Sequence, residues 1–425
     1  MSLNPEPAPT SEALAQARAH FEAGIAHFEH DRWPDAAAAF EAALALAPGR
    51  PSVLLNLGLT YLRQAKWPQA LPVLRQAVQA DDQRSDAWAA LAWVQHETGD
   101  WVEAVQAGER ALALGLPPSI DFLMRHAQCL SRLDRWQQAF DAYRQVLALA
   151  PDLHEALTEL GHLHRQRGET AQARQCYQQA RDAGADAELH AYYIAALDGN
   201  AQAAPQPPAA YVQGLFDQYA DDFDTHLVGT LGYQGHRVLI EQLPPDAPAR
   251  FAHVLDLGCG TGLCGQGIRA RAGRLSGIDL SPAMVERARA RGVYDTLQVA
   301  DITTYLQTCD AVFDLVLAAD VFIYVGALEP VFEALLPRLA PGGWLAFTIE
   351  EAASDQPPLV LGPDLRYAHA LPAVEALARQ HGLQVRSRLR APLRQDQRQP
   401  VWGRYLVLQR TTTIDGSDNT DGMGR

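Results

Sequence analysis

The chain has 425 residues, 48% of them hydrophobic, and a formal net charge of −15 at pH 7, so it is long enough for two hydrophobic cores and too acidic for a general nucleic-acid binder. It holds no apolar run of about 18 residues and begins without the basic-then-apolar order of a signal peptide, so we expect a cytoplasmic location and no membrane partner. Its five cysteines, an odd number, provide no paired disulfide framework.

A period of 34 to 35 residues runs through the first half of the chain. It relates one set of alanines and a second set of small residues: Ala36, Ala70, Ala104, Ala139 and Ala173, then Gly24, Gly58, Ala92, Ala127 and Gly161. Small residues at such positions let the two helices of a hairpin approach closely. The period is that of tetratricopeptide repeats. We predict an N-terminal tail over residues 1–16, followed by an all-α solenoid of five repeats plus a capping helix over residues 17–198.

Tryptophan recurs just before the second helix of four predicted repeats, at positions 33, 67, 101 and 136. This stripe has two interpretations, packing between helices or a cage for a ligand. Stacked helical hairpins form a concave surface that usually holds a protein or peptide, so we expect such a partner. The histidines at 154, 162 and 164 lack the cysteine or carboxylate that would complete a metal site at recognised spacing, and we expect no metal.

Residues 199–210 are rich in alanine and proline and have no periodicity, which predicts an extended, semi-stiff linker. The next segment predicts a helix with Phe216, Tyr219 and Phe223 on one aromatic face. For Tyr219 and Phe223, packing alone and contact with a ligand are both open interpretations.

The most informative segment is residues 254–265, where a short apolar strand leads through an acid into a glycine-rich loop. Glycine takes positive φ and has no Cβ, so the chain can turn sharply and lie against a ligand. Asp256 stands two residues before the first glycine, where its carboxylate can accept hydrogen bonds from an amino group of that ligand. Residues 260–265 also satisfy the G-x-G-x-x-G pattern of dinucleotide loops, so a nicotinamide cofactor is the rival interpretation.

Three more acids follow predicted strands. Asp279 ends the strand of residues 275–278 and is placed to hold two ribose hydroxyls, which both cofactor classes require. Asp301 follows the strand-like residues 297–300, where nicotinamide enzymes have no standard use for an acid. Asp320 ends the hydrophobic strand that begins at Phe313.

A turn and strand over residues 339–349 complete a set of five strands separated by helical segments, and Gly403–Gln409 is expected to pair antiparallel with Leu383–Ser387. This pattern predicts an α/β, Rossmann-like, doubly wound sheet that binds its ligand at the carboxyl ends of its strands. The predicted domain covers residues 211–410, and the polar, glycine-rich residues 411–425 predict a disordered tail.

Arginines cluster near the end of the domain, at positions 386, 388, 390, 394 and 398. They can either face an acidic substrate or form a solvated edge of a strand and loop.

The glycine loop and the ordered acids resemble those of class I S-adenosylmethionine-dependent methyltransferases. The lead-in segment 216–227 and the segment Arg366–His369, together with the repeats, resemble a bacterial family of predicted methyltransferases with N-terminal tetratricopeptide repeats. The resemblance implies S-adenosyl-L-methionine as the cofactor, with Asp301 at the adenine amine and Tyr219 and Asp320 near the methionine end. The implied cofactor-binding residues are Asp256, Gly258, Cys259, Gly260, Gly262, Asp279, Leu280, Asp301, Ile302, Asp320 and Tyr219.

Methyl transfer from a sulfonium is an in-line displacement, so the protein mainly has to align an unprotonated acceptor, and no metal is required. A hydroxyl or ammonium acceptor also needs a general base. The candidates near the predicted strand ends are His369, Tyr324, Glu350 and Asp320. His369 ranks first because imidazole titrates near neutrality.

Three functions remain open from the sequence. The first is a methyltransferase whose repeats recruit a protein substrate, or a carrier protein that bears one. The second is a methyltransferase for a small carboxylate, hydroxyl or amine, whose repeats serve assembly. The third is a non-catalytic scaffold that keeps the cofactor fold, against which the intact glycine loop and acids argue.

Overall fold

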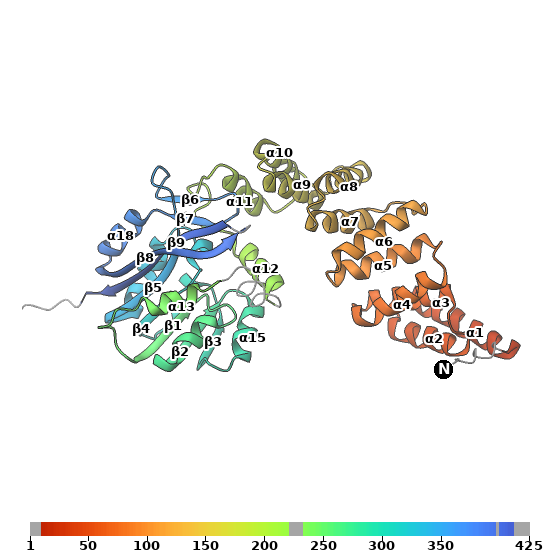
Figure 1. The fold of residues 1–425 in the computed structure, drawn as a ribbon, viewed down its shortest axis with the longest axis horizontal. Helices are drawn as coiled ribbons and strands as arrows, with labels where there is room; N and C mark the ends of the chain where they lie inside the picture. Colours follow the sequence, from red (N-terminus) through yellow and green to blue (C-terminus); the bar gives the residue numbers. More distant parts are fainter. Residues whose placement is uncertain (1–9, 221–232, 397–398, 412–425) are drawn as a thin grey trace, which may run out of the picture. The chain divides into compact units, whose positions relative to one another are not determined.

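The computed structural model describes residues 10–220, 233–396 and 399–411, and the chain divides into two compact units, Met1–Ala185 and Asp186–Arg425 (Figure 1). The predicted lead-in residue Phe223, Arg398 and the predicted tail from residue 412 onward lie outside the described residues. Within the described ranges, no helix has the length and apolar character needed to cross a membrane.

The first unit consists of helix pairs that follow the predicted repeat period (Figure 1). Its helices are α1 (Ser11–Glu29), α2 (Trp33–Leu46), α3 (Pro51–Arg63), α4 (Trp67–Ala80), α5 (Ser85–Glu97), α6 (Trp101–Ala113), α7 (Ile120–Arg132), α8 (Trp136–Leu149), α9 (His154–Gln166) and α10 (Thr170–Asp182). The all-α repeat architecture is therefore confirmed. Helix α1 begins inside the segment predicted as a tail, because the Thr10 side chain caps it by accepting a hydrogen bond from the Ala13 backbone N–H at 3.2 Å.

Small residues bring the two helices of a hairpin together, as predicted. A Cβ atom on Gly24, Gly58 or Gly161 would collide with a large side chain on the second helix of the same hairpin: Phe40, Leu74 or Tyr177. All four tryptophans of the stripe begin second helices. Trp67, Trp101 and Trp136 pack against the buried cores of the unit, and Trp33 meets the Phe28 ring at 4.9 Å between centroids. The stripe therefore serves packing.

The second unit is built on a nine-stranded sheet with the path order β3-β2-β1-β4-β5-β7-β6 and a C-terminal hairpin, β8–β9, that joins β5 through β9. Its strands are β1 (Phe251–Leu257), β2 (Ala272–Asp279), β3 (Thr296–Val299), β4 (Phe313–Ala318), β5 (Leu339–Glu351), β6 (Leu359–Leu361), β7 (Tyr367–His369), β8 (Leu383–Asp396) and β9 (Gln399–Arg410). Strands β1 to β5 run parallel, and β9 is antiparallel to both β5 and β8. The predicted doubly wound sheet and its antiparallel last strand are confirmed.

Helices cover both faces of this sheet (Figure 1). The helices of this unit are α11 (Ala187–Leu197), α12 (Ala209–Tyr219), α13 (Gly235–Glu241), α14 (Leu263–Ile268), α15 (Pro282–Ala290), α16 (Ile302–Thr308), α17 (Glu329–Leu335) and α18 (Leu371–Gln380). Alternate strand residues enter two separate cores. Leu255 and Val316 pack on the face that α16, α17 and α18 cover, while Val254 and Leu315 pack on the face of α13 and α14.

The segment before the sheet differs from the prediction. Helix α11, expected to cap the repeats, belongs to the second unit, where the Tyr192 hydroxyl donates a hydrogen bond to the Leu365 carbonyl at 2.8 Å. The expected extended linker is folded onto the same unit: the Tyr367 hydroxyl donates to the Ala204 carbonyl at 2.7 Å, and the Ala327 N–H donates to the Pro205 carbonyl at 2.9 Å. These contacts make residues 186–208 part of the α/β unit.

Candidate active site

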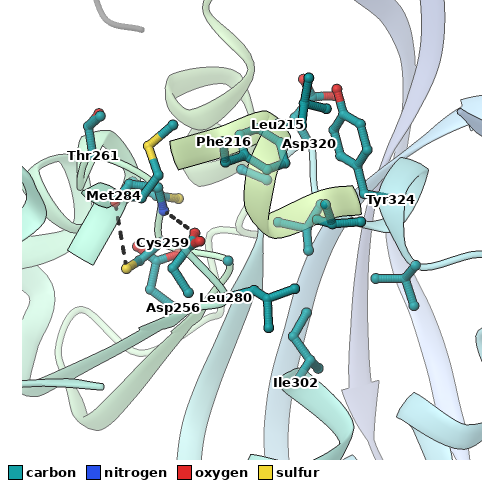
Figure 2. Close-up of a pocket in the computed structure, with 18 of the residues that line it drawn as sticks. Leu215, Phe216, Asp256, Cys259, Thr261, Leu280, Met284, Ile302, Asp320 and Tyr324 are labelled. Carbon is teal, nitrogen blue, oxygen red and sulfur yellow. Dashed lines mark hydrogen bonds between the residues drawn. The ribbon is translucent and has the colours of Figure 1, made fainter. Parts of the chain in front are cut away.

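A cavity of about 740 Å³ lies at the carboxyl ends of β1, β2 and β4. The glycine loop after β1, residues from the ends of the neighbouring strands and one side of α12 line it. Figure 2 shows Asp256 and Cys259 at one side of this cavity, Leu280 and Ile302 beneath it, and Asp320 and Tyr324 at the opposite side. A volume of this size suits a small organic ligand, since such sites usually occupy roughly 300–1,000 Å³.

The three glycines of the loop after β1 have different structural roles. Gly258, Gly260 and Gly262 all have positive φ, at 60°, 52° and 94°. A Cβ on Gly258 would lie 2.7 Å from a methyl carbon of Val321, whereas a Cβ on Gly260 would meet no atom of the described residues within 4 Å. Gly258 therefore allows close approach inside the protein, and Gly260 leaves open space beside the cavity. Gly262 is the N-cap residue of α14 and is not a lining residue.

Asp256 lines the cavity and is 1% exposed. Its Oδ2 accepts a hydrogen bond from the Tyr294 hydroxyl at 2.6 Å. Burial raises the pKa of Asp256 to about 7, although the bond from Tyr294 opposes the shift. Gly265 and Gly277 make room for the Tyr294 ring, because a Cβ on either would collide with it. The last glycine of the G-x-G-x-x-G match thus has a packing role that involves no ligand.

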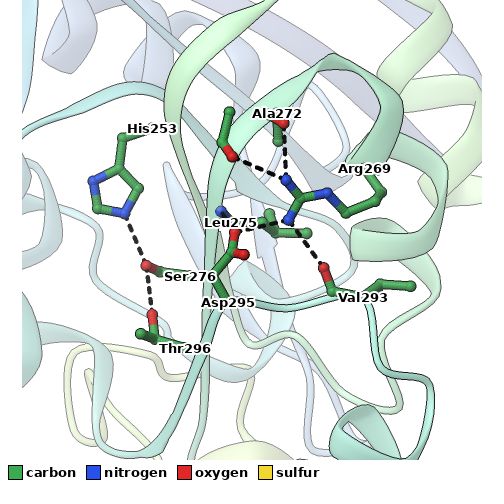
Figure 3. A network of polar contacts seen from close by, with 9 residues as sticks. His253, Arg269, Ala272, Leu275, Ser276, Val293, Asp295 and Thr296 are labelled. Carbon is green, nitrogen blue, oxygen red and sulfur yellow. Dashed lines mark hydrogen bonds and ion pairs between the residues drawn. The ribbon is translucent and has the colours of Figure 1, made fainter.

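A polar network fixes the loop that carries Tyr294 (Figure 3). The Arg269 guanidinium donates to the Val293 carbonyl at 3.1 Å and to the Asp295 carboxylate at 2.8 Å. It also bonds the Ala272 carbonyl at 2.9 Å, at the start of β2. Residues 293–295 are thereby held against β2, which positions the Tyr294 hydroxyl beside Asp256.

Asp279 ends β2 and connects two loops that border the cavity. Its Oδ2 accepts the Gly260 N–H at 2.8 Å, and its Oδ1 accepts the Ser281 N–H at 2.9 Å. Each carboxylate oxygen has a second lone pair, so both can still accept hydrogen bonds from a ligand. Burial raises the pKa of Asp279, which these backbone donors oppose.

Three further predicted cofactor residues line the cavity floor: Leu280, Asp301 and Ile302. Asp301 caps α16, because its Oδ1 accepts the Thr304 N–H at 2.9 Å, and its side chain remains exposed. Cys259 also lines the cavity, and burial raises its thiol pKa well above the ordinary value, so it stays a neutral wall residue.

Helix α12 borders the cavity with Val212, Leu215 and Phe216. Its Asp217 accepts the Ser281 hydroxyl at 2.5 Å, which attaches the helix to the N-terminus of α15. Asp217 was noted only as part of the lead-in segment 216–227, and Ser281 was not predicted as a site residue. Tyr219 ends α12, but its side chain lies outside what the structure describes.

A buried ion cluster forms the far wall of the cavity. Arg394 of β8 lies between two carboxylates, with Nη1 at 3.1 Å from Asp320 Oδ1 and Nη2 at 3.0 Å from Glu350 Oε2. The arginine side chain is 3% exposed. Asp320 has φ of 60° and its N–H donates to Thr348 Oγ1 at 2.7 Å, so its backbone is held in an uncommon conformation for a non-glycine residue. Asp320 lines the cavity and Glu350 does not; burial raises the pKa of Glu350.

The arginines of this segment therefore have different surroundings. Arg386, Arg388 and Arg390 form ion pairs with Asp246, Glu375 and Glu351 outside the cavity lining, while Arg394 enters the cavity wall. Neither interpretation of the segment holds for all its arginines.

Tyr324 and Arg366 complete the far wall. The Arg366 Nε donates to the Tyr324 hydroxyl at 3.1 Å, and the Tyr324 ring meets the Phe216 ring edge to face at 5.0 Å between centroids. Tyr324 was predicted as a site residue, whereas Arg366 was noted only as part of a family segment.

His369, ranked first as the general base, does not line the cavity. It is 4% exposed in β7, and its Nε2 lies 2.7 Å from the Gly326 carbonyl oxygen, which only a protonated Nε2 can bond. Burial lowers its pKa, so the ring is neutral. Strand β7 thus directs His369 into the protein, and this geometry gives no support to the prediction that His369 is the base. Glu350, also a candidate, is likewise outside the lining.

Comparison with known proteins supports two kinds of domain. Residues 254–343 match the model of a methyltransferase domain, and residues 17–50, 55–117 and 124–188 match tetratricopeptide repeat models. The chain is 35% identical over 99 residues to Methyltransferase-like protein 27 of Homo sapiens, a stretch of 23% of this chain and 40% of that protein. It is 28% identical over 91 residues to the Ubiquinone biosynthesis O-methyltransferase of Xylella fastidiosa, which covers 21% of this chain and 34% of that one. The chain thus spans less than half the length of these curated relatives.

Among solved structures, the magnesium protoporphyrin IX methyltransferase of Synechocystis PCC 6803 with bound SAH is similar at 16% identity and a TM-score of 0.39, covering 48% of this chain and 99% of that one. YrrB, described as a TPR protein with an unusual peptide-binding site, is similar at 17% identity and a TM-score of 0.39, covering 42% of this chain and 91% of that one. The family matches identify this chain as one that combines tetratricopeptide repeats with a methyltransferase domain.

Proposed function

We propose that the cavity binds S-adenosyl-L-methionine and that the protein transfers its methyl group to a small acceptor. One observation carries this proposal: Asp256, Asp279 and Asp301, from three successive strand ends, line a single cavity together with the glycine loop. A nicotinamide cofactor has no standard use for the third acid. The G-x-G-x-x-G match is by itself a weak signal for that rival.

The residues present fit the cofactor. Asp279 has free lone pairs for two ribose hydroxyls, and exposed Asp301 can accept the adenine amine while it caps α16. The open space beside Gly260 can receive the methionine portion, and Asp256 lies below it as an acceptor for the amino group. When bound, the cofactor supplies a methyl group on a positively charged sulfur.

The far wall would hold the acceptor. Arg394 and Thr348 fix Asp320, so its carboxylate can orient an acceptor hydroxyl or amine and take up the proton that the acceptor loses. Tyr324 lies on the same wall and can position the acceptor by its hydroxyl. With His369 turned away, Asp320 is the candidate base that this geometry favours.

We further propose that the repeats recruit a protein partner, such as a protein that carries or supplies the acceptor. Support comes from the first helices of three successive hairpins, where Trp93 of α5 lies between Arg63 of α3 and Arg125 of α7, with the guanidinium carbons at 5.8 and 4.5 Å from the ring centroid. A partly exposed arrangement of cations and an indole is typical of interaction surfaces. The alternative, repeats that serve only assembly, predicts equal turnover without residues 1–185.

Calorimetric titration of the full chain with S-adenosylmethionine and, separately, NADH tests the cofactor. We expect saturable binding of the first alone, and weaker binding by Asp279→Asn. The matched control is Asp310→Asn, which makes the same replacement at an acid outside the cavity lining. Binding of NADH alone, or equal affinity in Asp279→Asn and wild type, would contradict the assignment.

A further inference from the structure

Two guanidinium groups, those of Arg366 and Arg394, line the far wall of the cavity, and their partners differ. Arg394 is enclosed by the carboxylates of Asp320 and Glu350, at 3.1 and 3.0 Å. Its charge is therefore matched within the protein, and its side chain is 3% exposed. Arg394 organises the wall and is not available to a ligand as an unmatched cation.

Arg366 has a weaker counterion. Its Nη1 lies 3.6 Å from Asp364 Oδ2, and the Asp364 side chain is 42% exposed, so water screens this pair. Its Nε donates to the Tyr324 hydroxyl at 3.1 Å. Among the described residues, its Nη2 has no recorded hydrogen-bond partner. The guanidinium thus keeps both charge and donors for a ligand in the cavity.

The backbone holds Arg366 in place before any ligand arrives. Leu365 adopts φ of 65°, a costly conformation for a side chain of this size, and is 4% exposed. The turn is closed by hydrogen bonds from Leu365 N–H to the Gly362 carbonyl at 2.9 Å and from Gly362 N–H to the Arg366 carbonyl at 2.7 Å. The Tyr192 hydroxyl bonds the Leu365 carbonyl from α11. Such a prearranged group loses little conformational entropy on binding.

The lining of α12 that faces the same cavity is apolar. Val212, Leu215 and Phe216 line it, and Phe216 packs against Tyr324, the partner of Arg366. A planar guanidinium recognises a carboxylate through two parallel hydrogen bonds, and an apolar wall selects a hydrocarbon or aromatic body. The guanidinium and the apolar wall together suit a ligand that has a carboxylate and an apolar body.

We propose that Arg366 binds the carboxylate of the methyl acceptor, and that this acceptor is a small carboxylic acid with an aromatic or aliphatic body. The inference rests on the proposed methyl transfer, since it assigns the acceptor of that same site. Arg366 anchors the acid, and a second nucleophilic group of the same molecule, such as a hydroxyl, is directed toward Asp320. The bond to the methyl carbon forms at that group as the bond from carbon to sulfur breaks, the bonding pair stays on sulfur, and the proton passes to Asp320.

The test is equilibrium binding to the full chain saturated with S-adenosylhomocysteine, which carries the cofactor's own carboxylate but no methyl group. The probes are benzoate, 4-hydroxybenzoate, cinnamate and octanoate, each paired with its uncharged primary amide. We expect at least one acid to bind roughly ten-fold or more tightly than its amide, and Arg366→Met to abolish that preference. The matched control is Arg388→Met, which removes a surface arginine from β8 that lies outside the cavity lining.

Titration with S-adenosylhomocysteine distinguishes a failure of this inference from a failure of the proposed function. If Arg366→Met binds S-adenosylhomocysteine as well as wild type and loses the acids, the variant is folded and the inference holds. If Arg366→Met loses S-adenosylhomocysteine while Arg388→Met keeps it, the arginine serves the cofactor or the fold, and the inference is overturned. Equal binding of every acid and its amide also overturns it, with the cofactor assignment intact. Failure of wild type to bind S-adenosylhomocysteine overturns the proposed function itself.

Discussion

The hydroxyl of Tyr192 in α11 donates a hydrogen bond to the carbonyl of Leu365, 173 positions later in the chain, at 2.8 Å. Tyr192 is 2% exposed, and its ring also meets that of Tyr367 at 6.3 Å between centroids. The residue after Leu365 is Arg366, which lines the cavity. Helix α11, which we expected to cap the repeats, thereby supports the turn at Leu365 that places Arg366 in the cavity wall.

Tyr192→Phe should therefore weaken the second unit. The ring stays, but the buried Leu365 carbonyl loses its donor, and we expect a loss of about 1–3 kcal/mol in the free energy of unfolding. Denaturant unfolding followed by circular dichroism measures the effect. Tyr305→Phe is the matched control, because no hydrogen bond of the Tyr305 hydroxyl is recorded in the described structure. An equal loss in both variants would show that the Tyr192 bond contributes nothing specific.

Arg394→Met should destabilise the protein strongly. It leaves Asp320 and Glu350 facing each other without the cation between them, and removal of one partner from a buried ion cluster costs roughly 3–5 kcal/mol. Glu350→Gln in the same variant should restore part of that loss, because it removes one of the two orphaned charges. Unfolding free energies of the single and double variants give the comparison. A double variant less stable than Arg394→Met would contradict this account of the cluster.

Gly258→Ala should impair both stability and cofactor binding. The residue has φ of 60°, and its new Cβ would lie 2.7 Å from a Val321 methyl carbon. Gly292→Ala is the matched control, since Gly292 has φ of 66° but a Cβ there would meet nothing within 4 Å. Both variants incur the conformational cost of about 1–2 kcal/mol, and only Gly258→Ala adds the collision. Similar melting temperatures for the two would refute the close-approach role of Gly258.

Asp256 should make the stability of the second unit depend on pH. Its pKa is about 7 in the folded protein and 3.8 ordinarily, so between these values the native state holds a proton that the unfolded state has released. Stability must then fall as the pH rises from about 4 to about 7. Asp256→Asn cannot ionise, and it should be the more stable protein at pH 8 by an amount on the order of 4 kcal/mol, at 1.36 kcal/mol per pKa unit.

Denaturant titrations of wild type and Asp256→Asn at pH 5 and pH 8 test this expectation. Asp301→Asn serves as control, because Asp301 is exposed and asparagine also caps helices well. If the advantage of Asp256→Asn is as large at pH 5 as at pH 8, the titration of Asp256 is not its cause.

The repeats and the parallel strands could be predicted from the sequence because their signals are local. The spacing of Gly24, Gly58 and Gly161 reports contacts within single hairpins, and each strand of the sheet is a short apolar run followed by an acid or a glycine. The three acids of the proposed cofactor site follow from the rule that parallel strands share one carboxyl edge.

The far wall of the cavity could not be predicted in the same way. Arg388, Arg390 and Arg394 are even numbers of positions apart, so a regular strand would place their side chains on one face of the sheet. The pairing of β8 with β9 shifts register between Pro392 and Arg394, and both Leu393 and Arg394 are buried. A bulge of this kind redirects a side chain, and nothing in the local sequence specifies it.

The positions of residues 199–210 and of His369 differ from expectation for related reasons. Alanine and proline in residues 199–210 indicate that the segment is not helical, but the contacts that fold it down come from Ala327 and Tyr367, far along the chain. His369 follows a loop in sequence, yet it belongs to the short strand β7, which pairs with β6 and β5. Pairing between distant segments decided both positions.

The most direct test of the account is a crystal structure of the full chain with S-adenosylhomocysteine. We predict ribose hydroxyls within hydrogen-bond distance of Asp279, the adenine amine at Asp301, and the sulfur directed toward the wall of Asp320 and Tyr324. A ligand bound elsewhere, or one in this cavity whose ribose makes no contact with Asp279, would contradict the assignment of the cavity as a methyltransferase active site.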